Sequence, residues 1–441
     1  MSKERPALRR AIGPKLLLLF VLGDILGTGI YALTGDVAGT VGGAAWLAFG
    51  VAFLVAFCTA ASYVELVGKY PQAAGAALYT QRAFGRPFLT FLVAFAVMAS
   101  GLTSAGAASR SFAGYFQELA ALPVLLVALA FLLVLAAVNL RGVAESVKLN
   151  IVLTCVELAG LLIVVGTGAL ALARGVGDAG RALEFNADGT PFGLVVSGAA
   201  LAFFALVGFE DSVNMAEETT DPPRIFPRAV FGGLAAAGVL YMAVAFFATA
   251  LVPIDVLAES DQDLLEVVRV GAPSFPLGLF SLIAMFAVSN SALINMMMAS
   301  RLVYGLARED IIPPAFGAVH AGRRTPWVAI LFTTALVIAL ASWGGVRDLG
   351  GTTALLLLCV FALVNLAVLV LRRRPVAHAH YRAPTALPLL GVVSCAYLAS
   401  PLAGREPRQY WIAGALMGIG VALWVVNWAL HAKARPPRGA G

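Results

Sequence analysis

The stretch Gly23-Asp24-Ile25-Leu26-Gly27-Thr28-Gly29-Ile30-Tyr31 lies inside the first long apolar segment of the chain. In a helix interior each glycine costs roughly 1 kcal/mol relative to alanine, and a carboxylate inside a membrane costs several kcal/mol. A continuous membrane helix would therefore not carry three glycines and an aspartate at mid-depth. Such a break is tolerated where the freed backbone groups bind a solute or line a polar cavity. The stretch therefore indicates transport.

The composition predicts a membrane protein. Of the 441 residues, 60% are hydrophobic and only 12% are charged, whereas soluble domains carry about 25% charged residues. The apolar run that begins near Leu16 continues to the length of a full span, so we interpret it as a first membrane helix and not as a cleavable signal. All four cysteines lie in apolar segments, and we expect free thiols and no metal site.

Apolar runs of about 20 residues, the length of a membrane helix, recur along the chain. They predict twelve spans, near residues 16–40, 43–67, 88–116, 122–139, 147–172, 192–214, 228–252, 276–304, 326–343, 350–371, 386–402 and 409–430.

The distribution of lysine and arginine predicts the orientation of these spans. Twelve spans put both termini on one side, and 22 of the basic residues fall on that side. The six on the opposite side are Arg174, Arg181, Arg269, Arg347, Arg405 and Arg408. We therefore expect a multi-pass protein of the cell membrane with both termini in the cytoplasm. The net charge of +6 follows from this topology, so no nucleic acid partner is expected.

A second break occurs in the sixth segment, at Phe203-Phe204-Ala205-Leu206-Val207-Gly208-Phe209-Glu210-Asp211. Two interrupted helices five spans apart are typical of an inverted repeat of five plus five helices, whose first helices unwind at the bilayer midplane where substrate binds. Helix N-termini there suit an anion, and unwound carbonyls suit a cation, so the pair suits a zwitterion. The alternative is that Gly27 and Gly29 only allow close helix packing.

Six groups of residues, in order along nearly the whole chain, resemble one family. They are Leu26-Gly27-Thr28-Gly29-Ile30-Tyr31; Tyr63-Val64-Glu65-Leu66 with Tyr70-Pro71-Gln72-Ala73-Ala74-Gly75-Ala76-Ala77-Leu78-Tyr79; Asn139-Leu140-Arg141-Gly142; Gly208-Phe209-Glu210; Ala216-Glu217-Glu218-Thr219-Thr220-Asp221-Pro222 with Ile225-Phe226-Pro227; and Ala299-Ser300-Arg301-Leu302. The chain resembles the amino acid–polyamine–organocation superfamily, the permeases that share the inverted-repeat fold of the bacterial leucine transporter.

The resemblance implies an all-α integral membrane fold with 12 transmembrane helices, of which helices 1 and 6 are discontinuous. A single transporter domain would cover residues 1–441, with repeat one at about 16–172, repeat two at about 192–371 and two additional helices at about 386–430. The bundle containing the two broken helices would rock against a scaffold of helices three, four, eight and nine.

The resemblance also implies which residues bind the substrate. Backbone amides would meet its carboxylate at Gly27, Thr28 and Gly29. Backbone carbonyls would meet its ammonium at Ile25, Phe204, Ala205 and Val207. Polar candidates for the side-chain pocket are Ser100, Gly101, Thr103, Ser104, Asn290 and Asn295.

Two further positions correspond to gating residues of the family. Phe204 resembles the aromatic gate over the substrate, although an ordinary core aromatic is the alternative. Glu210 resembles the acid that links substrate binding to gate movement. Arg301 is expected near the cytoplasmic end of helix eight, where it could extend its charge to water.

Energy coupling is predicted from Glu157. Some proton-coupled relatives carry a lysine at the corresponding position of helix five, so this glutamate is a departure from the pattern. Burial favours the protonated form of a carboxyl group, and Glu157 could carry a proton, sharing it with Asp24 if the two are neighbours. Two other roles are open: a structural ion pair with a buried cation such as Arg110, and direct contact with a cationic substrate.

We therefore expect a secondary active transporter, not an enzyme, that moves an amino acid or related zwitterion by alternating access, driven by protons. The alternative is an exchanger for polyamines or cationic amino acids, which would be favoured if Asp24 or Glu157 opened into the cavity. A channel is disfavoured because no filter repeat is visible. No phosphate-binding motif is present, so we expect no cofactor. Expected partners are an amino acid or amine substrate, a proton and the membrane lipid, and the last two helices are the candidate contact for a homodimer.

Overall fold

The structure, a computed structural model, describes residues 12–72, 75–141 and 147–434. The basic residues at both extreme ends of the chain, together with Ala73, Ala74 and Gly142 of the family-like motifs, lie outside the described residues. The described part is helical, and its β pairing is limited to one bridge between Ile12 and Thr219. That bridge joins the segment before the first helix to the segment that follows the second break.

The helices follow one another with short connections. The first part of the chain forms α1 (Pro14–Ile25), α2 (Thr28–Val41), α3 (Ala45–Lys69), α4 (Gly75–Phe84), α5 (Pro87–Phe116), α6 (Val124–Arg141) and α7 (Val147–Ala173). The middle part forms η1 (Arg181–Leu183), α8 (Pro191–Ala202), η2 (Phe203–Leu206), η3 (Asp211–Met215), α9 (Pro222–Leu251), α10 (Ile254–Glu259) and α11 (Asp263–Gly271). The last part forms α12 (Leu277–Arg308), η4 (Pro314–Gly317), α13 (Trp327–Trp343), α14 (Val346–Leu371), α15 (Ala386–Ala399), η5 (Pro401–Ala403) and α16 (Pro407–Ala434).

The helices confirm the predicted all-α membrane fold. Within the described ranges, nine helices, or nearly continuous helical segments, are long and apolar enough to cross a membrane, and α1 with α2 forms a tenth, bent span. The remaining two predicted segments coincide with α13 and α15, which are apolar but have 17 and 14 residues. The count of twelve spans therefore stays a prediction, as does the division into two repeats.

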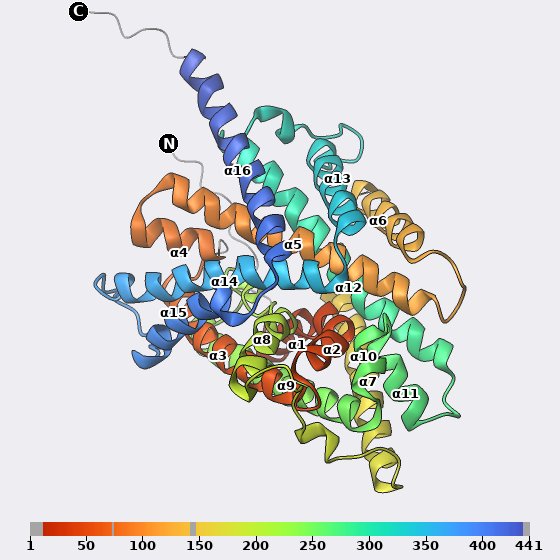
Figure 1. The fold of residues 1–441 in the computed structure, drawn as a ribbon. Helices are drawn as coiled ribbons and strands as arrows, with labels where there is room; N and C mark the ends of the chain where they lie inside the picture. The colour runs from red at the N-terminus through yellow and green to blue at the C-terminus, as the bar shows by residue number, and fades with distance from the viewer. Residues whose placement is uncertain (1–11, 73–74, 142–146, 435–441) are drawn as a thin grey trace, which may run out of the picture.

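Two groups of helices pack side by side. The group that contains both breaks consists of α1, α2, α3, α8 and α9. The other group consists of α5, α6, α12 and α13, and α7 and α14 pack against members of both groups. Figure 1 shows α1 and α2 near the centre of the molecule, next to α8 and α9, with α5 and α12 running beside them.

The two ends of α5 define two sides of the molecule. α5 begins directly after α4, and its other end packs against the segment that leads into α11, where a Cβ placed on Gly114 would lie 2.3 Å from the carbonyl oxygen of Asp261. α4 and α11 therefore lie at opposite ends of α5, as Figure 1 also shows. We call these ends the α4 side and the α11 side.

Candidate functional site

The first broken helix is interrupted where the sequence predicted. α1 ends at Ile25, α2 begins at Thr28, and the two helix axes differ in direction by 41°. The break falls on the Gly-rich stretch because glycine weakens the helix there. α2 begins with the amides of Thr28 and Gly29, and the first amides of a helix have no partner inside it.

The second broken helix confirms the other predicted interruption. α8 ends at Ala202, a single 3₁₀ turn follows, and the backbone becomes extended at Val207. Gly208 has a φ of 126°, a conformation that residues with a Cβ rarely adopt. The carboxylate Oε2 of Glu210 accepts a hydrogen bond of 2.8 Å from the Gly208 amide, so this acid stabilises the break from within.

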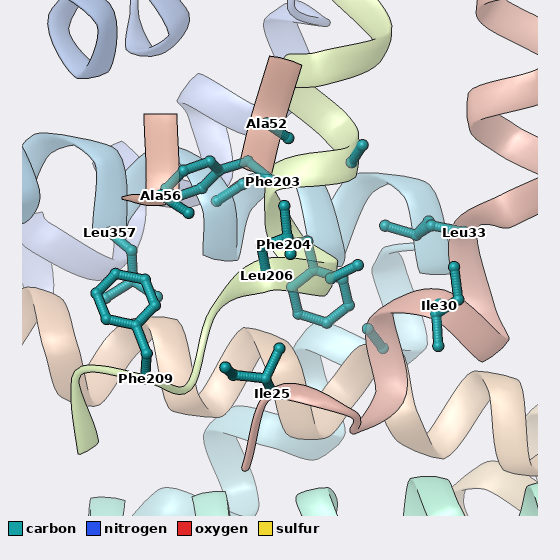
Figure 2. Packing of buried hydrophobic residues seen from close by; sticks show 14 of the residues in the cluster. Ile25, Ile30, Leu33, Ala52, Ala56, Phe203, Phe204, Leu206, Phe209 and Leu357 are labelled. Atoms are coloured by element: carbon teal, nitrogen blue, oxygen red, sulfur yellow. The ribbon is translucent and has the colours of Figure 1, made fainter. Parts of the chain in front are cut away.

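The two breaks touch each other through backbone atoms. A Cβ placed on Gly29 would lie 2.3 Å from Cα of Ala205. A Cβ placed on Gly208 would lie 2.5 Å from the carbonyl oxygen of Asp24. Figure 2 shows the two interrupted segments facing each other, with Ile25 and Ile30 on one and Phe204, Leu206 and Phe209 on the other. The glycines therefore permit a junction that no larger residue would allow.

A cavity of about 400 Å³ opens at this junction. Its volume falls within the range of ligand pockets, about 300–1,000 Å³. The predicted site residues that line it are Asp24, Ile25, Gly27, Thr28, Gly29, Phe204, Val207 and Glu210. Ala205 and Glu157 do not line it, because Ala205 packs against Gly29 and Glu157 is buried behind the break. We call this space the break cavity.

The break cavity extends from the junction toward the α4 side. Its further lining includes Gly75 of α4, Asn214 of η3 and the exposed Arg301 of α12. Toward the α11 side it ends at Phe204. A Cβ placed on Gly350 would lie 3.0 Å from Cδ1 of Phe204 and 2.8 Å from Cδ1 of Leu33, so the Phe204 ring packs beside α2 and α14.

Polar contacts hold α2 in place on the α11 side. The hydroxyl of Tyr115 donates to the carbonyl oxygen of Tyr31 at 2.8 Å. Oδ2 of Asp263 accepts from the Gly35 amide at 2.6 Å. Burial raises the pKa of Asp263 well above its ordinary value, and the neighbouring acids Asp36 and Asp261 raise it further, whereas the bond from Gly35 opposes this shift.

A third contact that holds α2 is formed by Arg347, which pairs with two acids. Nη1 of Arg347 lies 3.7 Å from Oδ1 of Asp36, and Nε of the same arginine lies 2.6 Å from Oε1 of Glu406. Arg347 belongs to the first turn of α14, and Glu406 directly precedes α16. Tyr115, Asp263 and Arg347 thus join α2 to α5, α11 and α14, and together they hold the cavity closed on this side.

The N-terminus of α2 lines the break cavity and has features that suit an anion, so we call it the anion site. The Thr28 side chain is 3% exposed, and its hydroxyl makes no hydrogen bond to any residue that the structure describes. A buried hydroxyl without a partner costs free energy, so a ligand that reached it would be stabilised. The α2 dipole places partial positive charge at the same point.

Glu157 lies on α7, close behind the first break. Its side chain is fully buried, and the side chain of Asn290 lies next to it. The hydroxyl of Tyr31 donates to the backbone carbonyl of Glu157 at 2.7 Å, and the hydroxyl of Tyr241 donates to the carbonyl of Ile25 at 2.6 Å. Tyr31 thus joins the backbone of Glu157 to α2, and Tyr241 joins α9 to the end of α1.

Arg110 has partners other than Glu157. Nε of Arg110 donates to the carbonyl oxygen of Ala341 at 2.7 Å, and the acid that faces the guanidinium is Asp261. Arg110 therefore contributes to the α11 side of α5, and the alternative that pairs it with Glu157 is wrong.

The polar candidates on α5 and α12 mostly meet at the break cavity. Ser100, Gly101, Ser104, Asn290 and Asn295 line it. Thr103 instead shares a hydrogen bond of 2.7 Å with Thr353, which does line it. No metal-binding group of three His, Cys, Asp or Glu residues occurs within the described ranges.

Sequence reasoning missed several cavity residues. A Cβ placed on Gly27 would lie 2.2 Å from Oγ of Ser291, so this serine contacts the first break. Met298 is 36% exposed and lines the cavity. Arg301 also lines the cavity, whereas the sequence predicted only that it lies near the end of its helix. The i, i+4 spacing of Ser291 and Asn295 was a signal that could have indicated a shared face.

Comparison with known proteins agrees with this architecture. A family model described as amino acid permease matches residues 12–428. The branched-chain amino acid permease BcaP of Bacillus subtilis is 26% identical over 416 residues, which cover 89% of this chain and 88% of BcaP. The methylthioribose transporter of Bacillus subtilis is 27% identical over 441 aligned positions, covering 93% of each chain. The low-affinity putrescine importer PlaP of Escherichia coli is 26% identical, covering 76% of this chain and 75% of PlaP.

Proposed function

Because the chain belongs to the amino acid permease family of the amino acid–polyamine–organocation superfamily, we propose that this transporter moves an amino acid or a related zwitterion by alternating access. The observation that carries the proposal is the contact between the two helix breaks at one cavity of about 400 Å³. A solute bound there touches both halves of both broken helices. Its binding can therefore bias their relative position.

The break cavity has complementary ends for a zwitterion. The substrate carboxylate binds at the N-terminus of α2, where the amides of Gly27, Thr28 and Gly29 and the unpartnered Thr28 hydroxyl are available. The ammonium binds to the carbonyls of Ile25, Phe204 and Val207, three residues that line the cavity. Ala205 contributes its backbone to the same break and holds it against Gly29.

Proton coupling is assigned to Glu157, with Asp24 as the acid that meets the solute. Complete burial of the Glu157 carboxyl favours its protonated form. Its neighbours Asn290 and Tyr31 lie on α12 and on the moving α2. Loss of the proton would leave a buried charge beside the first break, which a change of helix position could relieve. Phe204 and Glu210 act as the gating residues because both line the cavity at the second break.

The orientation follows from the positive-inside rule. The loops on the α4 side carry most of the basic residues, so we place this side and both termini in the cytoplasm and the α11 side outside the cell membrane. In that orientation the break cavity extends inward and the contacts of α2 close it outward. The conformation is then the inward-facing one.

A second candidate substrate class is favoured by a specific observation. Asp24 lines the break cavity, as do Glu210 and Asp211, and acids that line an intramembrane cavity attract cations. A cationic amino acid or a polyamine exchanged across the membrane would use Asp24 for its charged amine. The putrescine importer among the relatives is consistent with this class.

Counterflow in proteoliposomes tests the proposed function. Vesicles loaded with unlabelled solute would take up labelled solute transiently against its gradient, because a carrier exchanges one for the other. The solutes come from a thermal-shift panel of the twenty amino acids and common polyamines, since a ligand at 100 times its Kd stabilises by about 2.7 kcal/mol. Asp24→Asn separates the classes: it should weaken a cationic solute far more than a neutral one. Absence of both stabilisation and counterflow with every solute would overturn the proposal.

A further inference from the structure

Asn295 on α12 holds its side-chain amide in one orientation at the wall of the break cavity. Its Nδ2 donates to the carbonyl oxygen of Ser291 at 2.9 Å and to Oγ of Ser104 on α5 at 3.2 Å. A backbone carbonyl can only accept, so the nitrogen of the amide must face Ser291. Both hydrogens of the amide are then used, and the oxygen Oδ1 points the other way.

The oxygen of Asn295 faces Gly101 across the helix interface. A Cβ placed on Gly101 would lie 3.1 Å from Oδ1, which is tighter than ordinary van der Waals contact. Glycine at this position therefore leaves the oxygen uncovered, and both residues line the break cavity. Because Nδ2 makes the two hydrogen bonds of Asn295 that the structure describes, Oδ1 presents an acceptor to a solute.

A second acceptor lies on the same wall. The hydroxyl of Ser100 donates to the carbonyl oxygen of Val97 at 2.7 Å, so its proton is used inside α5 and its lone pairs remain. Ser100 is one residue from Gly101, and both line the cavity. The wall formed by Ser100, Gly101, Ser104 and Asn295, which we call the acceptor wall, thus offers oxygen atoms and few protons.

The acceptor wall lies at side-chain distance from the anion site. Ser291 contacts Gly27 at the first break, and Asn295 follows Ser291 by one helical turn on the same face of α12. One turn rises about 5.4 Å, which is close to the reach of an amino-acid side chain. A solute whose carboxylate lies at the N-terminus of α2 can therefore place the end of its side chain against Oδ1.

We propose that Asn295 is a specificity-determining residue that selects solutes whose side chain ends in a hydrogen-bond donor, namely a hydroxyl, an amide or an ammonium group. The inference rests on the proposed function and narrows its substrate class. An aliphatic side chain would leave the Asn295 oxygen without a partner in a buried site, and a buried acceptor left unpaired costs about 1–3 kcal/mol. Branched aliphatic amino acids are therefore disfavoured.

The test compares ligand affinities of the purified full-length protein and the variant Asn295→Leu. Serine, threonine, glutamine and lysine serve as donor-bearing probes, and leucine, isoleucine and valine as aliphatic probes, each titrated by thermal shift. The wild type should prefer at least one donor-bearing probe over all aliphatic probes by about tenfold or more. Asn295→Leu should reduce or reverse that preference, mainly by weakening the donor-bearing probe.

Two further variants keep the outcome interpretable if Asn295→Leu does not fold. Gly101→Ala places a methyl group over the Asn295 oxygen and should weaken the donor-bearing probe in the same way. Ser289→Ala is the matched control, because its hydroxyl bonds within α12 to Met285 and it does not line the cavity. It should leave all affinities unchanged.

The possible failures are distinguishable. A wild type that binds neither these probes nor any other solute of the panel contradicts the proposed function, whereas one that binds only solutes without a side-chain donor overturns the role of Asn295 alone. A wild type that prefers leucine, isoleucine or valine overturns the role of Asn295 while leaving the transporter assignment intact. An unchanged probe ranking in both Asn295→Leu and Gly101→Ala overturns it as well.

Discussion

The backbone amide of Gly35 donates a hydrogen bond of 2.6 Å to Oδ2 of Asp263, which is 228 positions further along the chain. Gly35 lies in α2, and Asp263 is the first residue of α11. A Cβ placed on Gly35 would lie 2.1 Å from the carbonyl oxygen of Leu257, so glycine allows the α10–α11 segment to approach α2. This contact fastens the half of the broken helix that lies beyond the cavity.

Asp263→Ala should loosen that half of the helix. Loss of one buried hydrogen bond costs about 0.5–1.5 kcal/mol, which corresponds to a several-fold rise in local opening. Hydrogen–deuterium exchange in peptides covering α2 and α11 would measure it. Asp263→Asn keeps an acceptor oxygen and should exchange nearly as slowly as the wild type. The exposed Asp255 of α10 provides the control Asp255→Asn, and equal effects at both positions would contradict the role of the contact.

The same contact should depend on pH. Burial and the acids Asp36 and Asp261 raise the pKa of Asp263 when α11 is docked, so the docked form binds a proton more tightly than an undocked one. Docking is therefore strongest below the ordinary pKa of aspartate and weakens as the pH rises through the raised value. Exchange in α11, corrected for its intrinsic rate, should increase with pH in the wild type. A wild-type slope equal to that of Asp263→Asn would be evidence against this titration.

Gly29→Ala should abolish substrate binding. Its Cβ would meet backbone atoms of Ala205 at 2.3 Å, and a backbone cannot move aside as a flexible side chain can. The two breaks would separate and the break cavity would change shape. A Cβ placed on Gly414 in α16 would meet no atom within 4 Å, so Gly414→Ala is the matched control. Thermal shift with the substrate should be lost in the first variant and kept in the second.

Glu157→Gln should separate exchange from uphill transport. Glutamine is uncharged, so the variant resembles the protonated form permanently and cannot release a proton beside the first break. Counterflow should continue, whereas uptake driven by an imposed pH gradient should fall at least tenfold. Vesicles with and without the gradient would be compared in the same preparation. Unchanged pH-driven uptake would show that the coupling proton binds elsewhere.

Glu65→Gln should destabilise the α4 side. Oε1 and Oε2 of Glu65 accept from Nε and Nη2 of Arg372 at 2.8 and 2.6 Å, and Oε2 also accepts from the Ala383 amide. The two side chains are only 3% and 10% exposed, and breaking a buried pair costs about 3–5 kcal/mol. The midpoint of thermal unfolding should fall clearly.

The exposed pair Arg224–Asp221 supplies the control for this loss. Its side chains are 83% and 47% exposed, and such pairs contribute about 0–1 kcal/mol. Asp221→Asn should therefore leave the unfolding midpoint nearly unchanged. A similar fall in both variants would mean that general loss of acidic charge, and not the buried pair, causes the effect.

The sequence predicted the two breaks because their cause is local. Glycines and an acid within an apolar run weaken the helix wherever the chain folds, and both interruptions fall within the stretches 23–31 and 203–211. The apolar segments likewise indicated the helices, since each carries enough hydrophobic length by itself. The predicted segments at α13 and α15 are also helical, with 17 and 14 residues.

The rest of the site could not be predicted because it depends on contacts between distant segments. Asn295 and Ser104 are 191 positions apart, and this spacing gives no indication that Ser104 fixes the orientation of the Asn295 side-chain amide. The burial of Glu157 behind the break, instead of in the cavity, follows from how α7 packs against α1 and α12. Arg301 was expected at a solvated helix end, and the space beside it exists only in the assembled molecule.

The junction at Gly29 and Gly208 has a mechanical consequence. Main-chain atoms meet main-chain atoms there, and neither partner has rotamers with which to absorb a shift. The two interrupted helices are thus in rigid contact with each other at their breaks. A tilt of one broken helix therefore shifts the other, and the two helices rotate together about their point of contact.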